Sequence, residues 1–146
     1  MKKYALPSIV ILIMLDQWTK SLAVKYLQEP WVIVKYWLEL RLAENEGVAF
    51  SLPVPSVLVL LLALCVVGYL AYQIRTKNLF NIEVFVYILV MAGAIGNVID
   101  RLMNQGKVID FIAIGSWPVF NVADSCITVG IVVYMAWELF GKKSIK

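Results

Sequence analysis

The chain of 146 residues is 62% hydrophobic and has a mean hydropathy of +0.82, whereas about 45–50% of the residues of an ordinary soluble domain are apolar. This composition predicts an integral membrane protein, and the length predicts a single domain over residues 1–146. The net charge of +3 comes from scattered Lys and Arg residues that form no basic stripe, which argues against nucleic-acid binding.

The absence of histidine restricts the chemistry that the chain could perform. It excludes Ser-His and Cys-His nucleophile pairs and the usual His-bearing zinc sites, so hydrolysis would have to use carboxylates, lysine or hydroxyls. Cys65 and Cys126 both lie in apolar stretches, where a thiol usually packs as a small hydrophobic group. We therefore expect no disulfide, no metal site and no cofactor.

The first predicted element is a spanning helix over residues 4–27. Two lysines precede an apolar run, a pattern that could also begin a cleaved secretory signal peptide. Asp16 and Lys20 interrupt the run, and the helical pattern continues beyond them, which favours an uncleaved span. The two charges are spaced i to i+4 with the acid first, the favourable order for an ion pair within a helix.

Residues 31–50 differ in character and predict a small extramembrane β element. Apolar and charged residues alternate strictly over residues 38–42, the period of a half-buried strand. Trp31 and Trp37 suit the membrane interface, where tryptophan side chains collect.

Three further apolar segments predict spanning helices over residues 53–74, 83–101 and 119–140. Between the last two, residues 103–118 contain two glycines and a proline and predict a loop with some membrane contact. The predicted fold class is an all-α membrane protein with four transmembrane helices and a small extracytoplasmic β element between the first two.

Several polar residues interrupt these apolar segments. Each would be costly inside a bilayer, so their presence indicates a function. They are Asp16, Asn97, Asp100, Arg101, Asp110, Asn121 and Asp124. Four spans alternate in direction, so the polar set is predicted to converge at one membrane face. The Lys and Arg residues divide almost equally between the two faces, 7 against 6, and the division becomes 7 against 4 when Lys20 and Arg101 are assigned to the site. On that assignment, both termini in the cytoplasm and the polar site facing outward are favoured.

Local spacing indicates how some of these residues are arranged, although each also has an ordinary structural explanation. Asn97 lies three residues before Asp100 and four before Arg101, so the three crowd one side of a helix end, where Asp100 and Arg101 could be ordinary terminal charges. Small residues just before Asn97 would let a neighbouring helix approach closely. Asn121 followed by Asp124 resembles a helix N-cap with an acid at the third position, a loose capping box.

Two carboxylates in an apolar environment can hydrolyse an amide without a metal ion. One is ionised and deprotonates a water molecule, while the other is protonated and polarises the carbonyl, because two close carboxylates hold one proton between them. Asp110 is flanked by apolar residues. Asp124, if it begins a helix, would be favoured as the ionised member.

Five short motifs resemble, in family order, those of the bacterial lipoprotein signal peptidases, also called signal peptidase II. They are Asp16-Gln17-Trp18-Thr19-Lys20, Asn45-Glu46-Gly47-Val48-Ala49-Phe50, Gly93-Ala94-Ile95-Gly96-Asn97-Val98-Ile99-Asp100-Arg101, Val108-Ile109-Asp110-Phe111 and Phe120-Asn121-Val122-Ala123-Asp124. Any one of them is a weak signal, whereas five in order are highly specific.

The resemblance implies a four-helix membrane aspartic endopeptidase that cleaves the signal peptide from diacylglyceryl-modified prolipoproteins, on the N-terminal side of the lipidated cysteine. The implied site comprises Asp110 and Asp124 as the catalytic pair, Asn45, Gly47, Asn97, Arg101 and Asn121 as substrate-binding residues, and Asp16, Lys20, Asp100 and Ala123 as supporting residues. The β element over residues 31–50 would form a cradle over the substrate. We expect a monomer in contact with membrane lipids, multi-pass in the bacterial cytoplasmic (inner) membrane, with its active site near the extracytoplasmic face.

Two departures from the family pattern are small. Ala92 stands where many members have the first glycine of a pair, and the loop between Asp110 and Asp124 is short, which bears on substrate preference. From composition alone, a small proton- or cation-coupled transporter or channel subunit and a purely structural membrane partner stay open. A proton relay should carry acids at several depths, whereas the inner halves of these spans hold no matching set.

Overall fold

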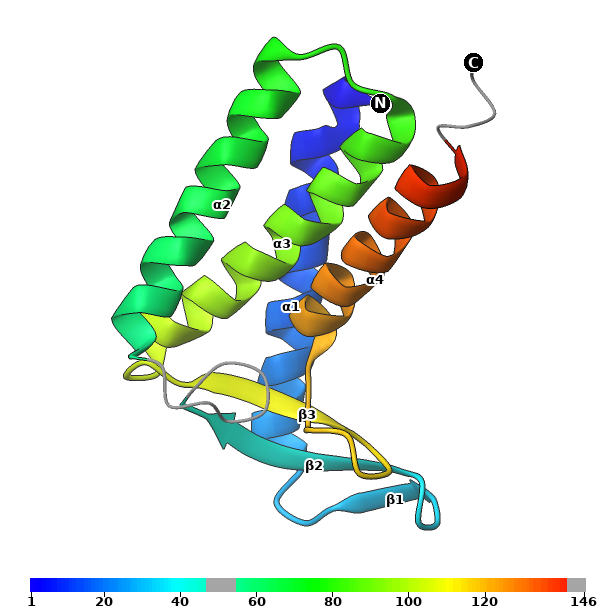
Figure 1. The fold of residues 1–146 in the computed structure, drawn as a ribbon. Helices are drawn as coiled ribbons and strands as arrows, with labels where there is room; N and C mark the ends of the chain where they lie inside the picture. Colours follow the sequence, from blue (N-terminus) through cyan, green and yellow to red (C-terminus); the bar gives the residue numbers. More distant parts are fainter. Residues whose placement is uncertain (47–54, 142–146) are drawn as a thin grey trace.

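The computed structural model describes residues 1–46 and 55–141, and it contains a long helix near each of the four expected positions. These helices are α1 (Ala5–Tyr26), α2 (Ser56–Thr76), α3 (Asn81–Met103) and α4 (Val122–Ala136). A short 3-10 helix, η1 (Lys2–Tyr4), precedes α1, and a π-helical turn, η3 (Trp137–Gly141), continues α4. Figure 1 shows a single bundle in which α1 begins and α4 ends at the same end.

Three of the helical stretches in the described residues are long and apolar enough to cross a membrane, namely α2, α3 and Val122–Gly141. Side chains such as Leu62 on α2 and Val132 on α4 are exposed, as expected for helices that face lipid rather than water. α1 has a comparable length of 22 residues. It differs in carrying Asp16 and Lys20, which are buried against the rest of the bundle.

α3 is the central helix of the bundle and packs against α1, α2 and α4. Far from the sheet, Ile9, Leu70 and Ile88 are buried together in a core shared by α1, α2 and α3. Nearer the sheet, α3 and α4 come so close that a Cβ added to Gly93 would lie 2.3 Å from the carbonyl oxygen of Ala123. The prediction that small residues before Asn97 permit close helix packing is therefore confirmed.

A three-stranded antiparallel sheet lies across the other end of the bundle (Figure 1). Its strands lie in the order β1 (Trp31–Val34), β2 (Leu38–Asn45) and β3 (Val108–Ile114). The pairing of β2 with β3 runs from Leu38 opposite Ile114 to Asn45 opposite Val108. The last residue of β2 therefore lies beside the first residue of β3.

The third strand corrects two of the predictions. Residues 103–118 were expected to form a loop, and the β element was expected only between the first two spans, yet β3 comes from this later segment. Its first four residues are all buried, which means that both faces of the strand are covered. An apolar run of this kind lacks the alternation that marks a half-buried strand. The all-α description thus leaves out the strand that carries Asp110.

Candidate active site

Two aspartates come together from different kinds of element, Asp110 from β3 and Asp124 from the first turn of α4. The chain between them folds back on the strand, because Phe120 forms an antiparallel bridge with Ile112. This bridge makes α4 begin beside β3. Both aspartates consequently line the same pocket.

Asn121 is the N-cap of α4 and explains why the helix begins there. Its side-chain oxygen accepts a hydrogen bond from the backbone N–H of Asp124 at 2.8 Å, and the Asp124 Oδ2 accepts one from the backbone N–H of Asn121 at 3.3 Å. The predicted capping box is therefore confirmed. The positive end of the helix dipole lies at this point and favours a negative charge on Asp124.

Three asparagine side chains donate hydrogen bonds to the two carboxylates. Asp110 receives one on each oxygen, from Asn121 Nδ2 to Oδ1 at 2.7 Å and from Asn45 Nδ2 to Oδ2 at 3.0 Å. The Oδ1 of Asp124 receives one from Asn97 Nδ2 at 2.8 Å. Asn121 Nδ2 also lies 3.1 Å from Asn97 Oδ1, so the amides join the two aspartates into one network.

A buried ion cluster lies behind this network. Lys20 Nζ lies 2.8 Å from Asp16 Oδ2 and 2.9 Å from Asp100 Oδ2, and all three side chains are almost fully buried. The same ammonium group donates to Asn97 Oδ1 at 3.1 Å. The predicted ion pair between Asp16 and Lys20 is confirmed, and Asp100 on α3 is a second partner.

The ion cluster also fixes the backbone of the two elements that carry the aspartates. Asp16 Oδ1 accepts from the backbone N–H of Ala123, at the start of α4, at 2.9 Å. Asp100 Oδ2 accepts from the backbone N–H of Ile109, on β3, at 3.0 Å. The residues just before Asp110 and Asp124 are therefore each held by a carboxylate from α3 or α1.

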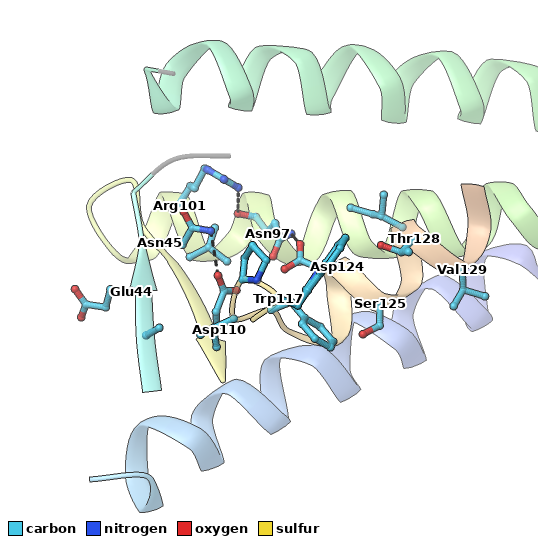
Figure 2. A pocket seen from close by; sticks show the side chains of 16 residues that line it. Glu44, Asn45, Asn97, Arg101, Asp110, Trp117, Asp124, Ser125, Thr128 and Val129 are labelled. Atoms are coloured by element: carbon cyan, nitrogen blue, oxygen red, sulfur yellow. Dashed lines mark hydrogen bonds between the residues drawn. The ribbon is translucent and has the colours of Figure 1, made fainter. Parts of the chain in front are cut away.

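The pocket has a volume of about 690 Å³ and is lined by both polar and apolar residues. Its polar lining includes Asn45, Asn97, Arg101, Asp110 and Asp124, and its apolar lining includes Trp117, Pro118, Val119, Ile127 and Val129. Figure 2 shows the aspartates between the end of β2 and α4, with Thr128 and Val129 farther along α4. A mixed lining of this kind suits a ligand that has both polar and apolar parts.

Burial is the largest cause, and the negative charge of Asp124 the next, of a rise in the pKa of Asp110 to about 7. The hydrogen bonds from Asn45 and Asn121 oppose this rise, because they stabilise the ionised carboxylate. At neutral pH a proton is therefore available on Asp110. A pair of aspartates with one shared proton can act as both acid and base on an amide.

The remaining predicted residues lie around this pair. Asn121 is fully buried and lies behind the aspartates rather than on the pocket wall. Arg101 lines the pocket from α3, where its Nη1 donates to the backbone oxygen of Asn97 at 3.3 Å. Ala123 is 1% exposed and takes part through its backbone. Gly47 lies outside the described residues.

Sequence reasoning assigned no role to several residues that build the site. Gln17 Nε2 donates to Asp100 Oδ1 at 2.9 Å and to the backbone oxygen of Gly96 at 3.2 Å, which ties α1 to α3. Its position inside an apolar helix, next to Asp16, was a usable signal. Trp117 and Ser125 line the pocket as well, but nothing in their local sequence distinguishes them from ordinary loop and helix residues.

Comparison with known proteins agrees with this geometry. The family model described as Signal peptidase (SPase) II matches residues 8–140. A lipoprotein signal peptidase of Thermodesulfovibrio yellowstonii is 44% identical, with 88% of this chain and 89% of that protein covered. A lipoprotein signal peptidase of Pelodictyon phaeoclathratiforme is 40% identical, with 90% of this chain and 88% of that protein covered.

Solved structures show the same fold. A bacterial membrane enzyme superposes with a TM-score of 0.86 at 25% identity, over 99% of this chain and 92% of that one. A second bacterial membrane enzyme superposes with a TM-score of 0.83 over 94% of each chain. Since the family model covers most of the chain and relatives at 40% identity or more extend over nearly all of it, the chain belongs to the signal peptidase II family of membrane peptidases.

Proposed function

We propose that this chain is a membrane aspartic endopeptidase that cleaves the signal peptide from diacylglyceryl-modified prolipoproteins, on the N-terminal side of the lipidated cysteine. Asp110 and Asp124 are the catalytic pair in this proposal. The observation that supports it most directly is that both aspartates line one pocket that also has a large apolar lining. Two relatives of the chain are named lipoprotein signal peptidases, which agrees with the proposed activity.

The two aspartates divide the chemistry according to their surroundings. Asp124, at the N-terminus of α4, takes a proton from a water molecule as the water oxygen attacks the carbonyl carbon of the scissile amide. Asp110 in its protonated form donates to the carbonyl oxygen. When the tetrahedral intermediate collapses, the C–N bond breaks and the proton on Asp124 passes to the amine nitrogen of the lipidated cysteine, while Asp110 regains its proton.

Asn45, Asn97 and Arg101 line the same pocket and serve in the proposal to hold the peptide beside the aspartates. Asn121 acts from behind, by fixing Asp110 and the start of α4. The ion cluster of Asp16, Lys20 and Asp100 holds the Asn97 side chain in place. It also holds the backbone N–H groups of Ile109 and Ala123, the residues just before the two aspartates. The apolar walls are where lipid chains or the hydrophobic part of the signal peptide would lie.

The proposed membrane arrangement has α1 as a fourth spanning helix, both termini in the cytoplasm and the active site near the extracytoplasmic face, in a monomer. At about 1.5 Å per residue, α1 is long enough to cross the hydrocarbon core. Its two internal charges, Asp16 and Lys20, neutralise each other and face α3 rather than lipid. The sheet would then lie at the outer membrane surface.

The test uses the purified protein in detergent, incubated with a diacylglyceryl-modified precursor and with the same precursor lacking the lipid. The wild type should release the signal peptide from the modified form. Asp110→Asn and Asp124→Asn should each lower the rate at least about a hundredfold, the usual contribution of a general acid or base. Glu29→Gln, the same chemical change at an exposed acid outside the pocket, should leave the rate unchanged.

Thermal unfolding in detergent should show that both aspartate variants are folded. Substantial turnover by either variant would refute the assignment of the catalytic pair. Equal cleavage of the lipidated and unlipidated precursors would refute the proposed substrate class.

A further inference from the structure

The end of the sheet beside the pocket carries an ion cluster that the catalytic assignment does not use. Lys107 Nζ lies 3.0 Å from Glu44 Oε2 and 3.1 Å from Glu46 Oε1. The residue between the two glutamates is Asn45, whose Nδ2 donates to Asp110 Oδ2 at 3.0 Å. One ammonium group therefore holds the residues on both sides of a side chain that contacts Asp110.

The alternation of a strand explains why the two contacts face in different directions. Neighbouring residues of a strand point to opposite faces, so Glu44 and Asn45 cannot serve the same partner. Figure 2 shows their side chains on opposite sides of β2, with Asn45 directed at Asp110. The ion pairs of the two glutamates with Lys107 on one face of the strand thus fix the direction of the Asn45 side chain on the opposite face.

The position of Asn45 makes such a restraint useful. Asn45 is the last residue of β2, and its pairing with Val108 is the last pair between β2 and β3. Strand ends are the parts of a sheet that open most easily. A contact that restrains this end of the strand therefore also restrains the side chain of its last residue.

Lys107 is well placed to supply that restraint because its own backbone is fixed. The backbone N–H of Lys107 donates to the carbonyl oxygen of Asn104 at 3.0 Å. The N–H of Gly106 donates to the carbonyl oxygen of Arg101 at 2.9 Å. Gly106 has a positive φ of 92°, which a glycine adopts without strain. The turn that carries Lys107 is therefore a direct continuation of α3.

We propose that Lys107 is a positioning residue: it holds the end of β2 against the turn before β3 and, through Asn45, keeps a hydrogen-bond donor on Asp110. The inference rests on the proposed function, since it takes Asp110 as a catalytic residue. Lys107 itself touches neither substrate nor reacting atoms.

A change of pH profile distinguishes this role from a merely structural one. The hydrogen bond from Asn45 lowers the pKa of Asp110, so its loss raises that pKa above its value of about 7. The other charged groups that act on Asp110 are Asp124 from α4, Lys20 from α1 and Arg101 from α3. None of these is altered by a change at Lys107.

The experiment measures kcat and KM for cleavage of a diacylglyceryl-modified precursor across pH, in detergent at low salt. The variants are Lys107→Met, Lys107→Arg, Asn45→Ala and the double variant Asn45→Ala/Lys107→Met. Arg41→Met is the matched control, because Arg41 forms an exposed ion pair with Glu39, at 3.3 Å, on the same strand. Glu44→Gln/Glu46→Gln removes the same contacts as Lys107→Met from the other side.

Lys107→Met should lower kcat about three- to tenfold, the range for one or two cross-strand charge pairs, with little change in KM. The alkaline limb of its pH profile should move to higher pH. Lys107→Arg should retain activity, and Glu44→Gln/Glu46→Gln should reproduce the loss even if Lys107→Met fails to fold. In the Asn45→Ala background, Lys107→Met should have no further effect, because both act on one contact.

Three results would overturn the inference: full activity of Lys107→Met at low salt, an equal loss in Arg41→Met, or a loss that adds to that of Asn45→Ala. If the wild type and Arg41→Met both fail to cleave the lipidated precursor, the proposed function itself is refuted. The two failures are therefore separate observations.

Discussion

Asp110 should make the folded protein less stable as the pH rises from about 4 to about 8. Its pKa is raised in the folded state from the ordinary value of 3.8 to about 7, mainly by burial. Between these two values the folded protein holds a proton that the unfolded chain has released, so the free energy of unfolding falls with rising pH. The difference between the two pKa values corresponds to a loss of at most about 4 kcal/mol in the free energy of unfolding. This is a large part of the roughly 5–15 kcal/mol that stabilises a typical protein.

The comparison of Asp110→Asn with the wild type isolates this contribution. The amide cannot ionise, but it leaves one of the donors from Asn45 and Asn121 without an acceptor oxygen, so the variant should be less stable than the wild type near pH 4 by about 1–3 kcal/mol. That deficit does not depend on pH. Between pH 4 and pH 8 the difference should move in favour of the variant, by up to about 4 kcal/mol.

The assay is denaturant unfolding in mixed micelles, followed by tryptophan fluorescence at several pH values. Glu29→Gln serves as the control, because it makes the same chemical change at an exposed acid outside the pocket. A difference for Asp110→Asn that does not change with pH, or one that Glu29→Gln reproduces, would refute the conclusion that burial keeps a proton on Asp110.

Two further changes test the packing around the site. Lys20→Met should lower the free energy of unfolding by about 3–5 kcal/mol, because it leaves the carboxylates of Asp16 and Asp100 buried without a cation. The same unfolding assay measures this loss. A variant as stable as the wild type would contradict the role of the ion cluster. Gly93→Ala should destabilise by about 1–3 kcal/mol, because its Cβ would lie 2.3 Å from a carbonyl oxygen of α4. Gly68→Ala, a helical position with nothing within 4 Å, should be neutral or stabilising by up to about 1 kcal/mol, and equal effects of the two glycine changes would refute the close contact.

The features that could be predicted from the sequence are those that depend on near neighbours in the chain. The helices follow from apolar length, and the start of α4 follows from the capping box of Asn121 and Asp124. The ion pair of Asp16 and Lys20 follows from their spacing on one helix. The capping box and the ion pair each involve residues no more than four positions apart.

The features that could not be predicted depend on contacts between distant elements. β3 was missed because its partner β2 lies more than sixty residues earlier and because burial of both faces removes the alternation of a strand. The second partner of Lys20, Asp100, lies on another helix. Spacing along one helix cannot reveal a contact of that kind.

The amides beside Asp110 and Asp124 have a physical reason that links these observations. A cation in contact with both carboxylates would favour the doubly ionised pair and remove the proton that the proposed mechanism requires. Lys20 instead pairs with Asp16 and Asp100, and its hydrogen-bonded connection to Asp124 runs through Asn97, over contacts of 3.1 Å and 2.8 Å. The amide transmits orientation rather than a full charge, since the ammonium fixes its oxygen and thereby directs its N–H at the carboxylate. The buried ions can then hold the site in place while the aspartates keep their shared proton.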